Sequence, residues 1–313
     1  MSPIRIGVVG VGKIARDQHL PAIAGNASFT LAATVNRSAP ASATNFASHV
    51  DMLAAGDGLD AVAITTPPGP RFAIARDCIA AGLHALLEKP PTATLAEIDA
   101  LRELAARRGV SLFTTWHAQH NPAVQAATAL LAGKRVREMV ILWHEDVDKW
   151  HPGQRWIWEA GGFGVFDPGI NAFSIASKIF PGSLFVREAA LTFRRGAHTP
   201  IAAEIAFASA ASAGPLRCSL DWRRAAGEEW TIRIVTEDDM TVELLDGGAR
   251  LLVDGAAQAA AGLGEYPDIY RRFAELIAAG ESEVDSVPLR MVADCLLVGS
   301  RHIDEEEAQA SGR

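Results

Sequence analysis

From residue 4 to about residue 133, short apolar runs alternate with longer segments in which apolar residues recur with a helical period. The runs are IRIGVVG, FTLAATVN, DAVAITT, HALLEKP and SLFTTWH, and a helical segment follows each of them. Stretches such as AVAIT and HALLE are nearly continuous in apolar residues, as expected for strands covered by helices on both faces. Right-handed crossovers would wind these strands into one doubly wound parallel sheet, which is an α/β arrangement.

After Gly133 apolar and polar positions alternate instead. The segments are VREMVILWHEDV, VREAALTFRR, IAAEIAFAS, LRCSLDWRR, EWTIRIVTE, MTVELLDG and ARLLVDG, with short turns between them. They predict an α+β region with a large, mainly antiparallel open sheet. Two closing helices are predicted near residues 267–279 and 288–302. The far face of such a sheet needs a cover, so we expect a homodimer through it.

Composition narrows the class of protein. With 313 residues, 49% of them hydrophobic, the chain can bury two cores. A net charge of -8 without a basic tract argues against nucleic acid, because phosphate binding needs clustered Lys and Arg. No long apolar run or signal-type start is present, so we expect no membrane association and a cytoplasmic location. Cys78, Cys218 and Cys295 are far apart and odd in number, which predicts neither disulfides nor a zinc site.

A glycine motif follows the first predicted strand and opens the first predicted helix. Its sequence, Gly10-Val11-Gly12-Lys13-Ile14-Ala15, matches G-x-G-x-x-G/A, in which the glycines let the backbone turn and approach a pyrophosphate. The helix end meets the phosphate charge, although a glycine-rich turn without a ligand would look similar. We therefore predict a Rossmann domain over residues 1–120 and a substrate-binding and dimerisation domain over residues 121–313. The cofactor contacts expected here are Gly10, Gly12, Lys13 and Ile14.

The second predicted strand ends in Asn36, Arg37 and Ser38, where an acid would normally bind the ribose 2′-hydroxyl of NAD. Arg37 and Ser38 instead suit a 2′-phosphate, so NADP is preferred and NAD is possible. Alternatively, Arg37 covers the adenine face from solvent. The third predicted strand also ends at the cofactor side, although an ordinary turn explains its residues nearly as well. These residues are Thr65, Thr66 and Pro67.

The fourth predicted strand ends in Glu88 and Lys89, followed by two prolines. The carboxyl ends of parallel strands face the cofactor crevice, so both residues are expected beside the nicotinamide. Pro90 biases Lys89 toward an extended conformation and stiffens its support, as a catalytic group requires. The alternative is a surface lysine that closes a strand, and the chemistry alone favours neither interpretation.

Several motifs together resemble those of one family. They are Gly10-Val11-Gly12, Thr66-Pro67-Pro68, Glu88-Lys89-Pro90 and a helix-opening Asp167 after Gly161-Gly162. This set is similar to that of the Gfo/Idh/MocA oxidoreductases, and the resemblance covers nearly the whole chain. It implies that Lys89 contacts the reacting hydroxyl and the nicotinamide. Residues 150–171, WHPGQRWIWEAGGFGVFDPGIN, show a narrower resemblance to the bacterial L-arabinose and D-galactose 1-dehydrogenases.

Asp167 and Pro168 open an apolar-periodic helix, with Asn171 one turn further on the same face. Asp at the N-cap and Pro at the first helical position are a common helix start, which by itself explains both residues. Catalysis is compatible with capping, because the helix end helps to hold Asp167 ionised. The family usually has histidine where this chain has Asn171, and an amide orients a hydroxyl without taking its proton. The base is therefore Lys89 or Asp167.

Four further residues are candidates for substrate binding: His117, Glu145, Trp150 and His151. His117 ends the fifth predicted strand, where it binds a sugar hydroxyl, shares in the proton transfer or is satisfied by a backbone carbonyl. Glu145 ends another strand and is favoured over its acidic neighbours. Trp150 and His151 lie in a stretch that interleaves apolar rings with polar groups, as a sugar pocket requires, although simple packing explains them equally well. Weaker candidates are Trp222 and Trp230. No histidine spacing suggests a metal site.

The expected reaction is the oxidation of the anomeric hydroxyl of an aldose to a lactone by an NAD(P)-dependent aldose 1-dehydrogenase. L-arabinose and D-galactose are the expected substrates, because they share the hydroxyl pattern around most of the ring. One alternative is an NADP-dependent dehydrogenase of another cyclic alcohol, such as an inositol or a dihydrodiol. The other is a nucleotide-sensing binding protein without catalysis. Lys89 and Asp167 argue against the sensor, and Asn171 weakens the case for inositol.

Overall fold

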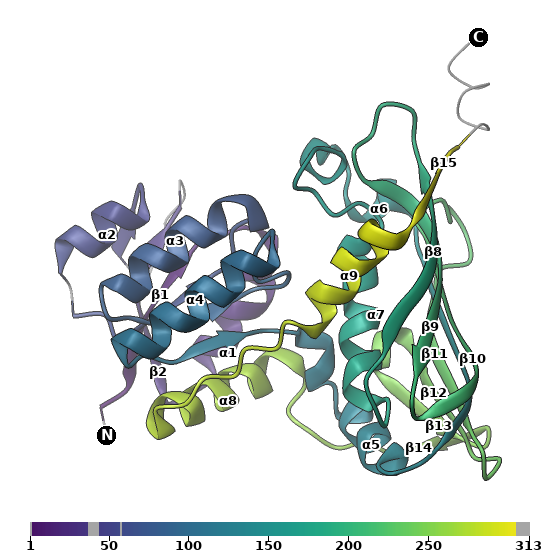
Figure 1. The fold of residues 1–313 in the computed structure, drawn as a ribbon. Helices are drawn as coiled ribbons and strands as arrows, with labels where there is room; N and C mark the ends of the chain where they lie inside the picture. The colour runs from purple at the N-terminus through teal and green to yellow at the C-terminus, as the bar shows by residue number, and fades with distance from the viewer. Residues whose placement is uncertain (1, 37–43, 57, 305–313) are drawn as a thin grey trace. The chain divides into compact units, whose positions relative to one another are not determined.

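The computed structural model of the chain describes residues 2–36, 44–56 and 58–304. The chain forms two compact units (Figure 1). The first comprises Met1–His120 and Leu263–Ser286, and the second comprises Asn121–Gly262 and Val287–Arg313. Among the described residues, none of the helices combines the length and the apolar composition that a membrane span requires.

The first unit is built on a six-stranded sheet. In spatial order the strands are β3 (Thr44–Phe46), β2 (Phe29–Val35), β1 (Ile4–Val9), β4 (Ala61–Ile64), β5 (His84–Leu87) and β6 (Leu112–Thr114). All neighbouring pairs are parallel, which confirms the predicted doubly wound sheet. The strand order reverses between β1 and β4, and in open sheets of this kind ligands bind beyond the carboxyl ends of the strands at such a point. The edge strand β3 was not among the predicted strands.

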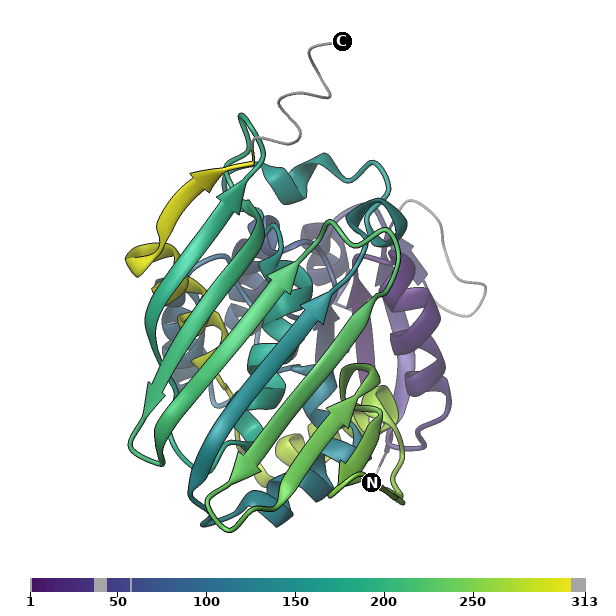
Figure 2. The same ribbon diagram turned by 90° about the vertical axis from the view of Figure 1, so that its right-hand side faces the viewer.

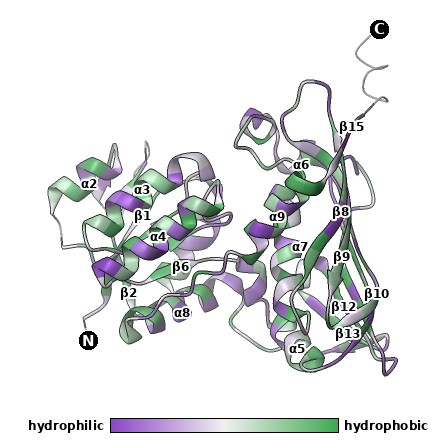
Figure 3. Cartoon of the chain, in the orientation of Figure 1, coloured by the Kyte–Doolittle hydropathy of each residue, from purple (hydrophilic) through white to green (hydrophobic). Residues whose placement is uncertain are grey.

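Helices cover this sheet. They are the π-helical turn η1 (Ala15–His19), α1 (Leu20–Ala24), α2 (His49–Ala55), α3 (Pro68–Ala80), α4 (Leu95–Arg108), the 3-10 turn η2 (His117–His120) and α8 (Glu265–Ala279). α4 begins with a capping box, in which Thr94 and Glu97 each accept a hydrogen bond from the other's backbone. Figure 3 shows hydrophilic and hydrophobic residues side by side along α4 and α8, as expected for helices with one face on a sheet.

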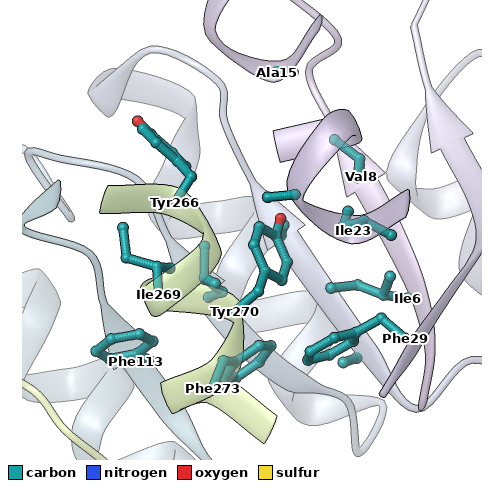
Figure 4. Packing of buried hydrophobic residues seen from close by; sticks show 14 of the residues in the cluster. Ile6, Val8, Ala15, Ile23, Phe29, Phe113, Tyr266, Ile269, Tyr270 and Phe273 are labelled. Carbon is teal, nitrogen blue, oxygen red and sulfur yellow. The ribbon is translucent and has the colours of Figure 1, made fainter. Parts of the chain in front are cut away.

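α8 packs into the core of the first unit. Its residues Tyr266, Tyr270 and Phe273 are buried in one apolar cluster with side chains from the sheet (Figure 4). The Phe273 and Phe29 rings stack with their centroids 6.0 Å apart. Residues 263–286 therefore belong to the first unit, whereas the predicted boundaries placed them in the second domain. The pattern of an amphipathic helix shows that it covers a core, but not which core.

The second unit contains one open nine-stranded sheet (Figure 2). In spatial order the strands are β14 (Ala256–Gln258), β13 (Arg250–Val253), β12 (Thr241–Leu245), β11 (Glu229–Thr236), β7 (Val136–His144), β10 (Ser212–Asp221), β9 (Pro200–Ser209), β8 (Phe185–Phe193) and β15 (Ser300–Ile303). The β7–β10 and β8–β15 pairs are parallel, and the other neighbours are antiparallel. The predicted large and mainly antiparallel sheet is confirmed.

One predicted helix of this unit is too long. α9 (Val287–Val298) ends before Gly299, and the next four residues form β15 beside β8, so the helix predicted over residues 288–302 is wrong at its end. The chain is tightly packed at this point, since a Cβ on Gly299 would lie 2.5 Å from the carbonyl oxygen of Cys295. A glycine at this position lets the chain leave the helix and join the sheet.

The other helical segments of the second unit are α5 (Pro122–Leu131), α6 (Val147–Trp150), η3 (Arg155–Trp158), α7 (Phe166–Ile179) and η4 (Asp246–Gly248). α7 is almost entirely buried and contacts β7 and β11, so it covers one face of the sheet. The opposite face is turned toward the viewer in Figure 2, with the helices behind it. Partly exposed apolar residues on that face include Val140, Leu142, Ala190 and Ala206.

Candidate active site

The glycine loop joins β1 to the first helical turn. Gly10 has a φ of +97°, a conformation that favours glycine, and its N–H donates to the Val35 carbonyl at 3.0 Å. No heavy atom lies within 4 Å of the position that a Cβ on Gly12 would occupy. Lys13 and Ile14 are exposed beside this opening. The loop therefore has the open backbone that a pyrophosphate needs, which fits the predicted dinucleotide role.

Alanine at Gly10 and at Gly12 is expected to have different effects. A Cβ on Gly10 would lie 2.9 Å from the Thr66 backbone nitrogen, so Gly10→Ala should destabilise the fold by about 1–3 kcal/mol. At Gly12 the methyl group meets only open space, so Gly12→Ala should leave the Tm unchanged while weakening dinucleotide binding at least about tenfold. Thermal unfolding and dinucleotide titration measure the two effects. Unchanged affinity in Gly12→Ala would contradict the phosphate role of the loop.

The strand ends next to the glycine loop are tied to it. The Asn36 side chain donates to the Val11 carbonyl at 3.0 Å. The Thr65 hydroxyl donates to carbonyls at the end of β1, which holds β4 beside the loop. Arg37 and Ser38, the predicted ligands of a 2′-phosphate, lie outside the described residues.

Thr66 and Pro67 connect β4 to α3. The Thr66 hydroxyl is buried and has no hydrogen-bond partner within the described part of the chain. Thr66 lies beside the glycine loop, because a Cβ on Gly10 would contact its methyl group and its backbone nitrogen. A buried hydroxyl without a partner is rare in folded proteins, and a bound dinucleotide would supply one here.

Glu88 and Lys89 directly follow β5. The Glu88 side chain is buried, and its Oε1 accepts hydrogen bonds from the Tyr266 hydroxyl at 2.6 Å and from His19 at 3.1 Å. Its Oε2 accepts from the Lys89 N–H at 2.7 Å. Burial alone would raise the pKa of Glu88, but the hydrogen bond and charge of His19, with smaller effects of His117 and Tyr266, hold this pKa well below its usual range. Glu88 is therefore an ionised carboxylate at neutral pH.

Arg71 holds the backbone on both sides of Lys89. This α3 side chain is buried, and its guanidinium donates to the carbonyls of Glu88 and Pro90 and to that of Thr66. A planar guanidinium can bind several carbonyls at once, so it connects the turn after β4 to the turn after β5. Sequence analysis missed Arg71, since an arginine within a helical stretch is normally exposed.

His117 lies in η2, beyond the end of β6, and not at the end of the strand as predicted. β6 pairs with β5 only as far as Thr114, after which the chain turns. The His117 Nδ1 lies 3.0 Å from the Glu265 carboxylate. Burial would lower the pKa of His117, but the hydrogen bond and charge of Glu265, assisted by Glu88, raise it overall, while the charge of Lys89 opposes the rise. His117 therefore lies within electrostatic reach of Lys89.

In the second unit, Asp167 lies in the first turn of α7. The helix begins at Phe166 and its N-cap is Val165, so the prediction that Asp167 is the N-cap is wrong. Gly164 has a φ of +54° and accepts the Asp167 N–H at 2.9 Å through its carbonyl, so the chain turns into the helix without a capping side chain. Asp167 as a whole residue is 7% exposed, and its carboxylate lies 3.5 Å from the His151 Nε2.

Asn171 follows one turn further along α7. Its side-chain oxygen is buried and has no hydrogen-bond partner among the residues that the structure describes. The His151 ring lies 5.1 Å from the Trp222 ring, centroid to centroid. Asp167, His151 and Trp222 thus form one cluster of polar and aromatic side chains, and Asn171 lies on the same helix one turn away.

Glu145 follows β7 and is buried. Its Oε1 accepts from the Trp222 indole at 2.8 Å, and its Oε2 accepts from the Trp230 indole at 3.0 Å. The two tryptophans therefore fix the carboxylate in one orientation. Trp222 and Trp230, the weaker candidates for sugar binding in the sequence, are both donors to Glu145 in the structure.

Trp150 is 47% exposed at the end of α6. Its indole N–H donates to Glu228 at 2.6 Å, and the Lys149 ammonium lies 4.9 Å from the centroid of its ring. The Trp150 and Trp230 rings meet edge to face at 5.8 Å. An indole fixed in this way and open to solvent has the apolar face that a sugar ring can cover.

The predicted site residues thus form one group in each unit. The first unit brings the glycine loop, Thr66, Lys89 and His117 to the carboxyl ends of its strands, and the second gathers Asp167 with His151. Within residues 2–36, 44–56 and 58–304, no group of three or more His, Cys, Asp and Glu side chains is placed to hold a metal ion. The contacts missed by sequence analysis are those of His19, Arg71, Glu265 and Tyr266.

A Rossmann-type sheet with a lysine after β5, followed by a unit with a large open sheet, defines a class of two-domain oxidoreductases. Residues 4–116 match the GFO_IDH_MocA model, described as an oxidoreductase family with an NAD-binding Rossmann fold. The chain belongs to this Gfo/Idh/MocA family, as the motifs indicated, and it is an enzyme.

Two of its relatives share a name. Galactose 1-dehydrogenase of Pseudomonas fluorescens is 43% identical over 304 residues, which cover 96% of this chain and 97% of the relative. The crystal structure of a D-galactose-1-dehydrogenase protein from Rhizobium etli superimposes with a TM-score of 0.92 at 46% identity, covering 97% of each chain. A 3-ketoreductase from Actinomadura kijaniata, solved with NADP, has a TM-score of 0.80 at 17% identity over 96% of this chain and 99% of its own, which shows a shared fold alone.

Proposed function

We propose that this chain is an NAD(P)-dependent aldose 1-dehydrogenase that oxidises the anomeric hydroxyl of D-galactose, of L-arabinose or of both to the lactone. The observation that carries the proposal is the likeness to galactose 1-dehydrogenases over nearly the full length of the chain. The surroundings of Lys89 and Asp167 support it, because Glu88 and Arg71 hold the backbone at Lys89 and the Asp167 carboxylate lies beside His151. L-arabinose is included as a proposed substrate because its ring matches that of D-galactose except at C5.

Nicotinamide dinucleotide, when bound, provides the acceptor for the hydride that leaves C1. In the proposed reaction, the Lys89 amine takes the proton of the O1 hydroxyl as that hydride departs. Asp167 is the other candidate for the acceptor of this proton. The His151 ring next to Asp167 keeps this carboxylate oriented.

Asn171 has a different role in this proposal. A carboxamide cannot take a proton near neutral pH, so it cannot replace the histidine that is usual in the family. Its buried and unpartnered oxygen is available to accept a hydrogen bond from a sugar hydroxyl. Glu145, His117 and Trp150 are the further substrate contacts that we propose.

NADP is the cofactor that we propose as preferred. Arg37 and Ser38 follow the second strand in the place where an acid would select NAD. Arg37→Ala should therefore weaken NADP binding at least about tenfold while changing the affinity for NAD less than about twofold. Equilibrium titration with the two cofactors measures both constants. Equal losses for NADP and NAD would show that Arg37 does not bind the 2′-phosphate.

The proposed activity can be tested by following the formation of reduced cofactor with a panel of aldoses, inositols and dihydrodiols. We expect turnover with D-galactose or L-arabinose and the lactone as product. Turnover confined to an inositol or a dihydrodiol would replace the proposal with that of another cyclic-alcohol dehydrogenase. Dinucleotide binding without turnover of any substrate would indicate a sensor.

We also infer a homodimer that forms through the open face of the nine-stranded sheet. That face carries the partly exposed residues Val140, Leu142, Ala190 and Ala206. Partly exposed apolar side chains on an open sheet face can be buried by a second copy, and a two-fold axis would pair the same face of both.

A further inference from the structure

A series of buried polar side chains, linked by hydrogen bonds, ends at the backbone of Lys89. Tyr270, His19 and Glu88 are linked in sequence, with 2.8 Å between the Tyr270 hydroxyl and the His19 Nδ1 and 3.1 Å between the His19 Nε2 and Glu88. Tyr266 reaches the same Glu88 oxygen directly, at 2.6 Å. His19, Tyr266 and Tyr270 are each at most 3% exposed. None of these three side chains takes part in the proposed chemistry.

We propose that Tyr266 is a positioning residue for Lys89, because its hydroxyl fixes the Glu88 carboxylate that holds the Lys89 amide. The inference rests on the proposed function, in which Lys89 takes the O1 proton. Tyr266 lies in α8, so this helix has a part in the reaction although it is far from Lys89 in the sequence.

The donors and acceptors among these buried side chains can be assigned from their chemistry. A carboxylate only accepts and a phenol has one proton to donate, so the Tyr266 hydroxyl donates to Glu88. The His19 Nε2–H donates to the same carboxylate, and the His19 Nδ1 shares a hydrogen bond with the Tyr270 hydroxyl. The Glu88 Oε1 thus receives two donors, which leaves Oε2 to accept the Lys89 N–H at 2.7 Å. Removal of one donor would let the carboxylate rotate.

A rotation of the Glu88 carboxylate would change the position of the Lys89 backbone. Arg71 holds the carbonyls of Glu88 and Pro90, so the backbone on both sides of Lys89 is fixed from the α3 side. The carboxylate of Glu88 fixes the amide between those carbonyls. A change at Glu88 therefore moves the point from which the Lys89 side chain leaves the backbone, and a small displacement of a reacting group can greatly reduce the rate.

Tyr266 is placed for this role by the apolar cluster of the first unit. In Figure 4 the hydroxyls of Tyr266 and Tyr270 point away from the rings of Phe113 and Phe273. The Tyr266 ring also stacks on His117, with centroids 5.9 Å apart and an interplanar angle of 18°. The ring is therefore held by packing, and only its hydroxyl contacts Glu88. Phenylalanine at this position keeps the packing and removes that contact alone.

The experiment compares Tyr266→Phe with Tyr270→Phe in the full chain. Both changes delete one buried hydroxyl, but that of Tyr270 reaches Glu88 only through His19. We expect Tyr266→Phe to lower kcat for the best aldose about tenfold, with KM and dinucleotide Kd nearly unchanged, and Tyr270→Phe to lower kcat less than about threefold. Thermal unfolding of the two variants should agree closely.

A double-mutant cycle with Lys89 separates positioning from a general loss of structure. If Tyr266 acts through Lys89, adding Tyr266→Phe to Lys89→Ala should reduce the remaining rate less than about twofold. An equal loss in both backgrounds, or equal kcat losses in the two Phe variants, would overturn the proposal. A wild-type enzyme that oxidises no aldose would instead remove the proposed function itself, and the two failures are thus distinct.

Discussion

Replacement of Lys89 by alanine is expected to lower kcat for aldose oxidation about 1000-fold while changing dinucleotide Kd less than about threefold. The Lys89 side chain is the proposed acceptor of the O1 proton, whereas the proposed pyrophosphate site is the glycine loop after β1. Deleting the amine removes the proton transfer and leaves that loop intact. Steady-state rates with saturating sugar, together with a dinucleotide titration, measure the two quantities separately.

Lys134→Ala is a matched control for this variant. Lys134 is partly exposed and pairs with the exposed Asp238 in the second unit, so its removal should change kcat less than about twofold. If Lys89→Ala retained wild-type turnover, Lys89 would have no part in the mechanism. If Lys89→Ala lost its fold along with dinucleotide affinity and turnover, the measurement would be made on Lys89→Met instead, because methionine preserves the length of the side chain.

Asp167→Asn is expected to lower kcat about 100-fold or more, with the fold intact. The amide has nearly the same shape, but it accepts no proton and lacks the negative charge next to His151. Asp167 is 7% exposed in the first turn of α7, where loss of the charge also costs about 0.5 kcal/mol of interaction with the helix end. The kinetic loss should therefore be far larger than the loss of stability.

Rates and unfolding curves of Asp167→Asn measure this difference, with Asp238→Asn as the control. Asp238 is exposed and bonded to Lys134, so its amide variant should match the wild type in kcat. A wild-type rate in Asp167→Asn would exclude the carboxylate from proton transfer. A loss that appears only in KM would assign Asp167 to sugar binding.

Patterns that depend on local sequence predicted much of the fold. Runs such as AVAIT became β4, and the alternation after Gly133 became the open sheet, since both patterns reflect which faces of a strand are buried. The edge strands β3, β14 and β15 were missed, because their sequences, TNF, AAQ and SRHI, lack the apolar runs that predicted strands as short as β4 and β6. Residues 263–286 were assigned to the wrong unit for a different reason: helical amphipathicity says nothing about which sheet the helix will cover.

The residues of the candidate site also differ in whether the local sequence could predict them. Gly10, Gly12 and Lys89 could be proposed because a turn after a strand has a local sequence signature. The contacts of Arg71 and Tyr266 with the turn after β5 could not be found, since they join segments that are far apart in the chain. The N-cap prediction for Asp167 failed because Gly164 turns the chain earlier than the Asp-Pro pair suggested.

The most direct measurement uses D-galactose or L-arabinose that carries deuterium at C1, with the oxidised cofactor and the wild-type enzyme. The account predicts that the deuterium moves to C4 of the nicotinamide while the sugar becomes the lactone. Deuterium that stays on the sugar while the cofactor is reduced would contradict oxidation at the anomeric carbon, and with it the roles given to Lys89 and Asp167.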